Sequence, residues 1–92
     1  NNVKSNLNAN IKIINDTSIT LSIFWNKYMH QNFTQINIST CVSIGDVSSN
    51  NLYNIKTHIG DQFIIGYYDI DKHFNICRVI NVKAMREVFT ID

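Results

Sequence analysis

The sequence lacks the features that mark membrane-spanning and nucleic-acid-binding proteins. Its longest apolar runs, at residues 23–25 and 63–65, fall far short of the roughly 20 residues that span a bilayer, so a membrane span is excluded. Eight Lys and Arg residues stand against seven Asp and Glu residues, and the basic ones are scattered along the sequence. A nucleic-acid groove needs a concentrated positive patch, so nucleic acid is not an expected partner.

Proline is absent, although an average protein contains about 5% of it. Asn and Ile together supply 30 of the 92 residues. We interpret this composition as an AT-rich coding bias. The high asparagine content is therefore not taken as a functional signal.

What the composition does supply is enough for one folded domain. Ninety-two residues allow a single hydrophobic core, and 45% apolar, 11% aromatic and 16% charged residues are typical of a globular chain. We expect one domain over residues 1–92, with residues 1–8 as a flexible N-terminal lead. Because the chain starts at Asn1 rather than Met, we expect a processed product or a segment of a larger polypeptide or complex.

Cysteines and sequons leave the compartment open. Cys41 and Cys77 lie 36 residues apart without metal-ligand spacing, so a disulfide between them and two free thiols are both possible. Asn15, Asn32 and Asn37 begin Asn-x-Ser/Thr sequons, which would accept glycans in a secreted protein. A similar number of sequons is expected by chance, so cytoplasmic and secreted locations both stay open.

Alternation of apolar and polar residues predicts short β-strands along the chain. The clearest alternation covers residues 18–25, and the turn formers at 15–18 predict that this strand forms a hairpin with residues 10–14. Further strands are predicted at 34–38, 42–44, 52–59, 63–68 and 74–80. Residues 82–89 would also suit a short helix, but a closing strand at 88–91 is favoured.

This pattern predicts an all-β fold. Seven or eight short strands with turn signals every 8 to 12 residues are typical of an antiparallel β-sandwich. Residues 63–68 are apolar on both faces, so this strand is expected to be covered on both sides. No helical pattern of ten residues lies between the strands, which disfavours parallel βαβ units.

No catalytic constellation is recognisable. The candidate nucleophiles and bases are Cys41, Cys77, His30, His58 and His73, and no catalytic signature surrounds any of them. We interpret the cysteines as buried or disulfide-bonded and the histidines as surface or turn residues. The chain is therefore expected not to be an enzyme.

Asp69 and Asp71 are the one pair of nearby carboxylates that could hold Ca²⁺ or Mg²⁺. Such ions take six or more oxygen ligands, which the neighbouring residues do not supply. We interpret both residues as turn formers and expect no metal and no cofactor.

Trp25 is the only tryptophan, and it ends the strongest predicted strand. It is in phase with Ile23, which is typical of a core residue. A tryptophan directly before a loop would equally suit the floor of a binding pocket, where a flat apolar face with one N–H donor is useful. Both interpretations stay open.

Five segments in this order, at residues 13–17, 21–26, 44–45, 53–66 and 76–79, carry a resemblance that extends over most of the chain. They are Ile-Ile-Asn-Asp-Thr, Leu-Ser-Ile-Phe-Trp-Asn, Ile-Gly, the Tyr-x-Ile-Lys-Thr-His-Ile-Gly-Asp-Gln-Phe-Ile-Ile-Gly block and Ile-Cys-Arg-Val. The series resembles the β domain of the von Hippel-Lindau tumour suppressor. The resemblance implies a seven-stranded, prealbumin-like β-sandwich that binds a hydroxyproline-containing peptide.

The resemblance also implies a site. Trp25 matches the family's pocket tryptophan, and Thr57 stands where the family has a hydrogen-bonding serine. Asp61 replaces a pocket histidine and Phe63 replaces a second tryptophan, while His58 lies between the matched positions. Asp61 can only accept hydrogen bonds and Phe63 has no N–H, so the ligand is expected to differ from that of the family.

Two further parts of the family's pattern do not carry over. Tyr28 and Phe33 are both possible matches for the family's pocket tyrosine, because the loop after Trp25 is longer here. No segment resembles the helical part that recruits a ubiquitin-ligase scaffold.

These observations predict a non-catalytic binding module that recognises a peptide or protein through Trp25, Thr57, His58, Asp61 and Phe63. One alternative is a secreted, glycosylated sandwich for adhesion or carbohydrate binding. Another is a structural accessory domain of a larger protein.

Overall fold

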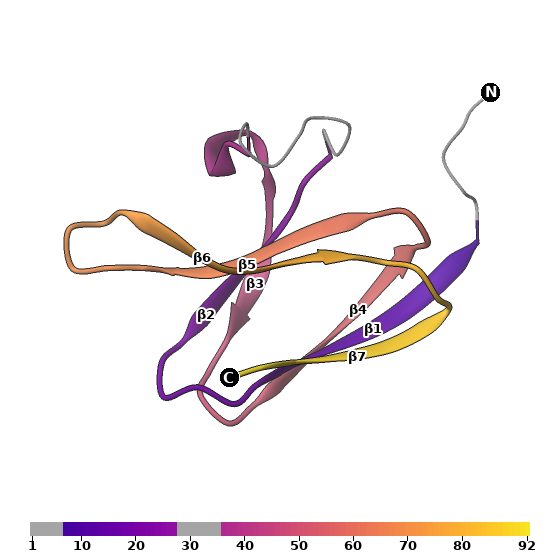
Figure 1. The fold of residues 1–92 in the computed structure, drawn as a ribbon, viewed down its shortest axis with the longest axis horizontal. Coiled ribbons are helices and arrows are strands. Elements are labelled where there is room, and N and C mark those ends of the chain that lie inside the picture. The colour runs from indigo at the N-terminus through magenta and orange to yellow at the C-terminus, as the bar shows by residue number, and fades with distance from the viewer. Residues whose placement is uncertain (1–6, 28–35) are drawn as a thin grey trace.

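The computed structural model describes residues 7–27 and 36–92, and this part of the chain is all-β (Figure 1). It contains no α-helix, and no helix in it is long and apolar enough to cross a membrane. A 3₁₀ helix, η2, covers Ile38–Thr40. The strands are β1 (Asn8–Asn15), β2 (Leu21–Trp25), β3 (Val42–Val47), β4 (Leu52–His58), β5 (Gln62–Tyr68), β6 (Phe74–Asn81) and β7 (Arg86–Ile91).

The described strands form two sheets, one of three strands in the order β4-β1-β7 and one of four in the order β3-β2-β5-β6. Every pair is antiparallel except β1 and β7, which run parallel with Asn10 beside Arg86. The expectation of a purely antiparallel arrangement is therefore wrong for this pair. After β6 the chain crosses to the other sheet and joins it at the edge of β1 that β4 leaves open (Figure 1).

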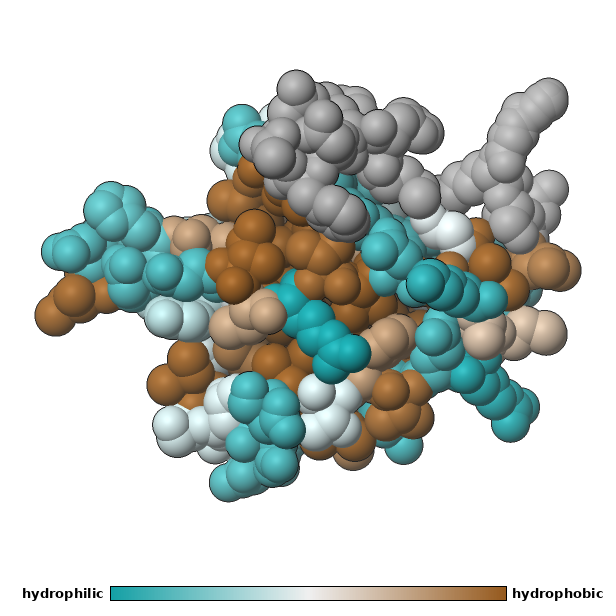
Figure 2. Space-filling model, viewed as in Figure 1, coloured by the Kyte–Doolittle hydropathy of each residue, from teal (hydrophilic) through white to brown (hydrophobic). Residues whose placement is uncertain are grey.

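Both sheets contribute to one buried hydrophobic cluster. The strand periodicity explains this, because every second residue points to the same side of a sheet. In β1, for example, Ala9, Ile11 and Ile13 are at most 1% exposed, whereas the residues between them are more accessible. The other members of the cluster are Leu21, Ile23, Val47, Ile55, Phe63, Ile65, Ile80, Val82 and Ile91. In Figure 2, apolar residues gather in the middle of the view, and the protruding end of the β5–β6 hairpin, at the left, is mostly hydrophilic.

The predicted hairpin between residues 10–14 and 18–25 is wrong, because β1 and β2 belong to different sheets. The turn formers are nevertheless used. The Asn15 side chain donates to the carbonyls of Ile19 (2.7 Å) and Val47 (2.9 Å) and accepts from the Thr17 N–H (2.9 Å). These bonds hold the chain as it passes from one sheet to the other, and Ile19 is left 42% exposed outside β2.

The strand predicted at 34–38 is wrong in its described part. Ile36 and Asn37 lie outside any strand, and η2 begins directly after them. The Asn37 side chain accepts from the Ser39 N–H at 3.1 Å, which caps the helix and competes with extended pairing. Residues 34 and 35 lie outside the described residues.

Strand β3 is longer than predicted, because it continues through Gly45 and Asp46 instead of stopping there. A bulge makes this possible: Ile23 pairs with Gly45 and Phe24 with Ser43, so Ile44 is the extra residue. Gly45 lies against the ring of Tyr53 on β4, where an added Cβ would come within 2.9 Å of ring carbons. Tyr53 donates to the Ile44 carbonyl at 3.2 Å, which connects the two sheets.

The later predictions hold. Strands β4, β5 and β6 cover the stretches predicted at 52–59, 63–68 and 74–80, and β5 is buried on both faces as expected. The tail forms β7 rather than a helix. At the other end of the chain, β1 takes in Asn8, the last residue of the predicted lead; residues 1–6 lie outside the described residues.

Candidate binding pocket

An open pocket of about 270 Å³ lies where β2, β4 and β5 meet the β4–β5 turn. It contains all five residues predicted from the sequence to contact a ligand. The residues that line it are Trp25, Ile44, Ile55, Lys56, Thr57, His58, Asp61 and Phe63. The fold thus brings together side chains that are up to 38 residues apart in the sequence, from Trp25 to Phe63.

Trp25 and Phe63 form the aromatic part of the pocket. They are direct neighbours on β2 and β5, so their rings lie side by side on the inner face of the four-stranded sheet. Phe63 is 2% exposed, whereas Trp25 is half-buried and packs against the core cluster. Both interpretations of Trp25 are therefore partly right, because the residue contacts the core and lines the pocket.

The polar part of the pocket is built by the β4–β5 turn. Thr57 Oγ1 donates to Asp61 Oδ2 at 2.5 Å, and the His58 N–H donates to the same oxygen at 3.1 Å. The turn is closed by the Asp61 N–H, which donates to the His58 carbonyl at 3.1 Å. Gly60 has φ +102, a conformation that residues with a side chain rarely adopt. The turn thereby holds a carboxylate that is only 5% exposed at the wall of the pocket.

The side chain of His58 lies beside this carboxylate. Its Nδ1 lies 3.8 Å from Asp61 Oδ2, and the side chain is 47% exposed.

A row of three amides links the ends of β2 and β6 to the start of β5. Asn26 Nδ2 donates to Gln62 Oε1 at 2.7 Å, and Gln62 Nε2 donates to Asn81 Oδ1 at 3.0 Å. Asn26 and Gln62 are 3% and 4% exposed. These residues were not predicted from the sequence; the only available signal was that each stands directly beside an aromatic residue of the pocket, Trp25 or Phe63.

Hydrogen bonding in the pocket determines what a ligand must offer. A threonine hydroxyl has one proton, and Thr57 uses it on Asp61, so toward a ligand this oxygen can only accept. A carboxylate likewise only accepts. The pocket therefore suits a group that places an apolar surface against Trp25 and Phe63 and directs an N–H or O–H toward Thr57 and Asp61.

The predicted glycan acceptors fall into three situations. Asn15 is 0% exposed and both its side-chain donors are used, so the folded chain leaves no room for a glycan there, and this prediction is wrong. Asn37 is exposed. Asn32 lies outside the described residues, as do His30, Tyr28 and Phe33.

Of the two possibilities left open for Cys41 and Cys77, the structure has free thiols, and because Cys41 is half-buried and Cys77 exposed, their interpretation as buried or disulfide-bonded residues is wrong. Cys41 directly precedes β3 and Cys77 lies on β6, and these strands are the two edges of the four-stranded sheet. Three strand spacings, about 14 Å, separate such positions, and a disulfide needs Cα atoms within about 7 Å. Partial burial raises the pKa of both thiols, which keeps them protonated and weakly nucleophilic at neutral pH.

Asp69, Asp71 and His73 bring ligand atoms within 4.8 Å of one another in the β5–β6 turn. Asp69 Oδ1 accepts from the N–H groups of Asp71 and His73, both at 2.9 Å, and Oδ2 accepts from Asn75 Nδ2 at 3.1 Å. These bonds, that from the His73 backbone foremost, lower the pKa of Asp69. The geometry is that of a carboxylate closing a turn, as interpreted from the sequence.

Comparisons of the chain with protein-family models, with curated proteins and with solved structures find no match. A function must therefore be argued from the geometry above.

Proposed function

We propose that this chain is a non-catalytic recognition module. In this proposal its two sheets form a β-sandwich like the von Hippel-Lindau β domain, and it binds a peptide or protein segment in the pocket lined by Trp25, Thr57, His58, Asp61 and Phe63. The observation that carries the proposal is that strands β2, β4 and β5 and one turn converge to put an aromatic pair beside a pair of acceptor oxygens.

The proposed ligand is a side chain with an apolar body and a hydrogen-bond donor. Its apolar surface lies on the Trp25 and Phe63 rings, and its N–H or O–H reaches Thr57 Oγ1 or Asp61. Hydroxyproline meets this description, because its ring is apolar and its hydroxyl can donate. Tyrosine and lysine meet it as well, so we propose a class of ligand rather than one residue.

The alternative of a secreted, glycosylated adhesion domain loses two of its supports. The Asn15 amide is buried and cannot carry a glycan in the folded chain, and Cys41 is not joined to Cys77. No observation in the described residues favours this alternative over peptide recognition.

The test uses a random peptide library displayed on phage, selected on the immobilised chain. Synthetic versions of enriched peptides are then titrated while the emission of Trp25, the sole tryptophan, is recorded. We expect enriched peptides to combine an apolar group with a donor, and Trp25→Ala to weaken binding roughly 30-fold, since central interface aromatics contribute about 2 kcal/mol. Binding to this variant is followed by calorimetry.

Tyr68→Ala is the matched control, because Tyr68 is a 52% exposed aromatic residue outside the pocket. It should bind the same peptides as the wild type. The proposal fails if no peptide is enriched, or if Trp25→Ala loses thermal stability while it binds the peptides as tightly as before.

A further inference from the structure

The outer face of the three-stranded sheet gathers basic side chains that are scattered in the sequence. Lys12 lies on β1, Lys56 on β4 and Arg86 on β7, at positions that alternate with the core residues. In the strand register Asn10 is paired with Lys56 on one side and with Arg86 on the other. Lys12 is two residues further along β1. We call the outward positions of β4, β1 and β7 the outer face.

Sheet geometry gives the spacing of these cations. Neighbouring strands lie about 4.8 Å apart, and two residues advance about 6.6 Å along a strand. The Cα atoms of Lys56 and Arg86 are therefore about 10 Å apart, and that of Lys12 lies about 8 Å from each. Three long, flexible cationic side chains can thus reach one bound segment.

No outward position of these three strands holds an acidic residue. The residues of the outer face are Asn8, Asn10, Lys12, Ile14, Leu52, Asn54, Lys56, His58, Arg86, Val88 and Thr90. The neighbouring Glu87 alternates to the other side, where its Oε1 accepts from the N–H groups of Lys83 (2.7 Å) and Ala84 (3.0 Å). Within the described part of the chain, Lys12, Lys56 and Arg86 have no ion-pair partner.

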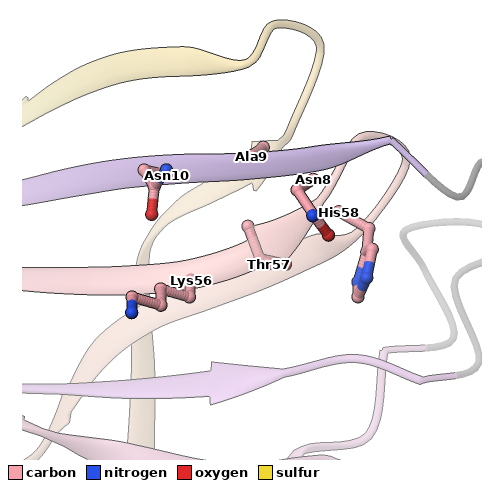
Figure 3. Close-up of a pocket in the computed structure, with 6 residues that line it drawn as sticks. All are labelled: Asn8, Ala9, Asn10, Lys56, Thr57 and His58. Atoms are coloured by element: carbon pink, nitrogen blue, oxygen red, sulfur yellow. The ribbon is translucent and has the colours of Figure 1, made fainter.

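Two hollows on this face meet at Asn10. One, of about 300 Å³, is lined by Asn8, Ala9, Asn10, Lys56, Thr57 and His58 (Figure 3). The other, of about 220 Å³, continues past Asn10 to Lys12, Asn54 and Arg86, and Glu87 at the β7 edge also contributes to its lining. The three asparagine amides offer both donors and acceptors beside the cations.

These features select among anionic partners. The outer face has no Phe, Tyr or Trp, so it lacks the aromatic platforms on which single-stranded nucleic acids stack their bases. An extended peptide fits better. Its backbone N–H and C=O groups can pair with the asparagine amides. Carboxylates on alternate residues of an extended peptide are about 6.6 Å apart, and Lys12 lies the same distance along β1 from the level of Lys56 and Arg86.

We propose that the outer face binds an extended acidic peptide segment of a partner protein. Its carboxylates pair with Lys12, Lys56 and Arg86. This surface is distinct from the Trp25 pocket, although both are lined by Lys56, Thr57 and His58.

The test measures fluorescence anisotropy of a labelled ten-residue polyglutamate peptide in about 50 mM salt, where surface charges are weakly screened. Lys12→Gln/Arg86→Gln is the test variant, because neither residue lines the Trp25 pocket. Lys72→Gln/Lys83→Gln is the control, since it removes two exposed positive charges that lie outside the three strands of the outer face. We expect the wild type and the control to bind equally and the test variant to bind roughly five- to tenfold more weakly. Trp25→Ala should bind polyglutamate like the wild type.

Polyglutamine, a sulfated oligosaccharide and oligothymidylate are measured alongside. Tighter binding of the oligosaccharide or of the oligonucleotide than of polyglutamate would overturn the proposal and assign the face to that ligand. So would equal losses in the test and control variants, or no binding of polyglutamate. If only Trp25→Ala lost polyglutamate binding, the binding site for acidic peptides would be the Trp25 pocket and not the outer face.

Discussion

The two ends of the molecule each bury a polar side chain, and they use it differently. At one end, which we call the enclosed end, Asn15 is 0% exposed, and its amide makes two donor and two acceptor hydrogen bonds. At the other end, which we call the pocket end, Asp61 is 5% exposed and accepts hydrogen bonds from Thr57 and His58, but it also lines a pocket of about 270 Å³. We infer that a buried polar group enclosed by its own chain serves the fold, whereas one at the wall of a pocket is placed to serve a ligand as well.

Asn15→Ala tests the enclosed end and should have the largest effect. It leaves the Val47 carbonyl without its partner at a buried site, and the Ile19 carbonyl and the Thr17 N–H without theirs at partly buried sites. Buried unpaired groups cost about 1–3 kcal/mol each before relaxation, so we expect about 3 kcal/mol of lost unfolding free energy. Urea unfolding measures this, and peptide binding by the folded fraction should be unchanged.

Asn37→Ala is the control, because Asn37 makes the same kind of bonds to Ser39 that Asn15 makes to Thr17, but at an exposed site. It should change the unfolding free energy by no more than about 0.5 kcal/mol. Equal effects of the two substitutions would show that enclosure is not what distinguishes Asn15.

Asp61→Ala tests the pocket end and should affect stability and binding together. The hydroxyl of Thr57 and the N–H of His58 lose their acceptor, which we expect to cost about 2 kcal/mol of unfolding free energy. Selected peptides should also bind more weakly, because an acceptor of the pocket is gone. Urea unfolding and calorimetry measure the two effects.

Asp69→Ala is the corresponding substitution in a turn that lines neither the pocket nor the outer face. It should lower stability less and leave peptide binding intact. If Asp61→Ala destabilises the chain and binding survives, Asp61 belongs with Asn15 as a purely structural residue.

The residues of the pocket end were predicted through the family resemblance, whereas the role of Asn15 at the enclosed end was not predicted. The β4–β5 turn is local, and Thr57 and Asp61 are four residues apart, so their grouping needs no knowledge of sheet topology. Asn15 binds Val47, which is 32 residues away, and this contact depends on which sheet each strand joins. Periodicity predicts that residues 10–14 and 21–25 are extended, but it contains no information on strand partners.

The same limit explains the other errors. The parallel pairing of β1 and β7 and the gathering of Lys12, Lys56 and Arg86 follow from strand order and register, which alternation does not encode. Asn37 was placed in a strand because Ile36 and Ile38 are in phase, but its side chain caps a helix instead. Three residues of alternation are too few to outweigh a local hydrogen bond.

Thr57→Val tests the Thr57 hydroxyl both as a donor to Asp61 and as an acceptor for a ligand. It should lower the unfolding free energy less than Asp61→Ala does. Valine keeps the shape of threonine but removes one donor to Asp61 and one acceptor for a ligand. We expect a loss of about 1 kcal/mol in stability together with weaker peptide binding. Thr57→Ser should restore both, and a serine variant that folds well but fails to bind would assign the effect to the methyl group instead.

The smallest effect is expected at Asp69, away from both ends. Its hydrogen bonds lower its pKa in the folded chain, so the charged form contributes stability above the unfolded pKa of about 3.9, and this contribution is lost as the pH falls through the folded value. Urea unfolding of the wild type and Asp69→Asn should show a constant difference above about pH 5 that shrinks at lower pH. Asp71→Asn is measured alongside as the control for the loss of one carboxylate from the same turn, because it keeps the backbone N–H that donates to Asp69. A difference for Asp69→Asn that widens in acid would mean that the hairpin is destabilised, not supported, by its carboxylate.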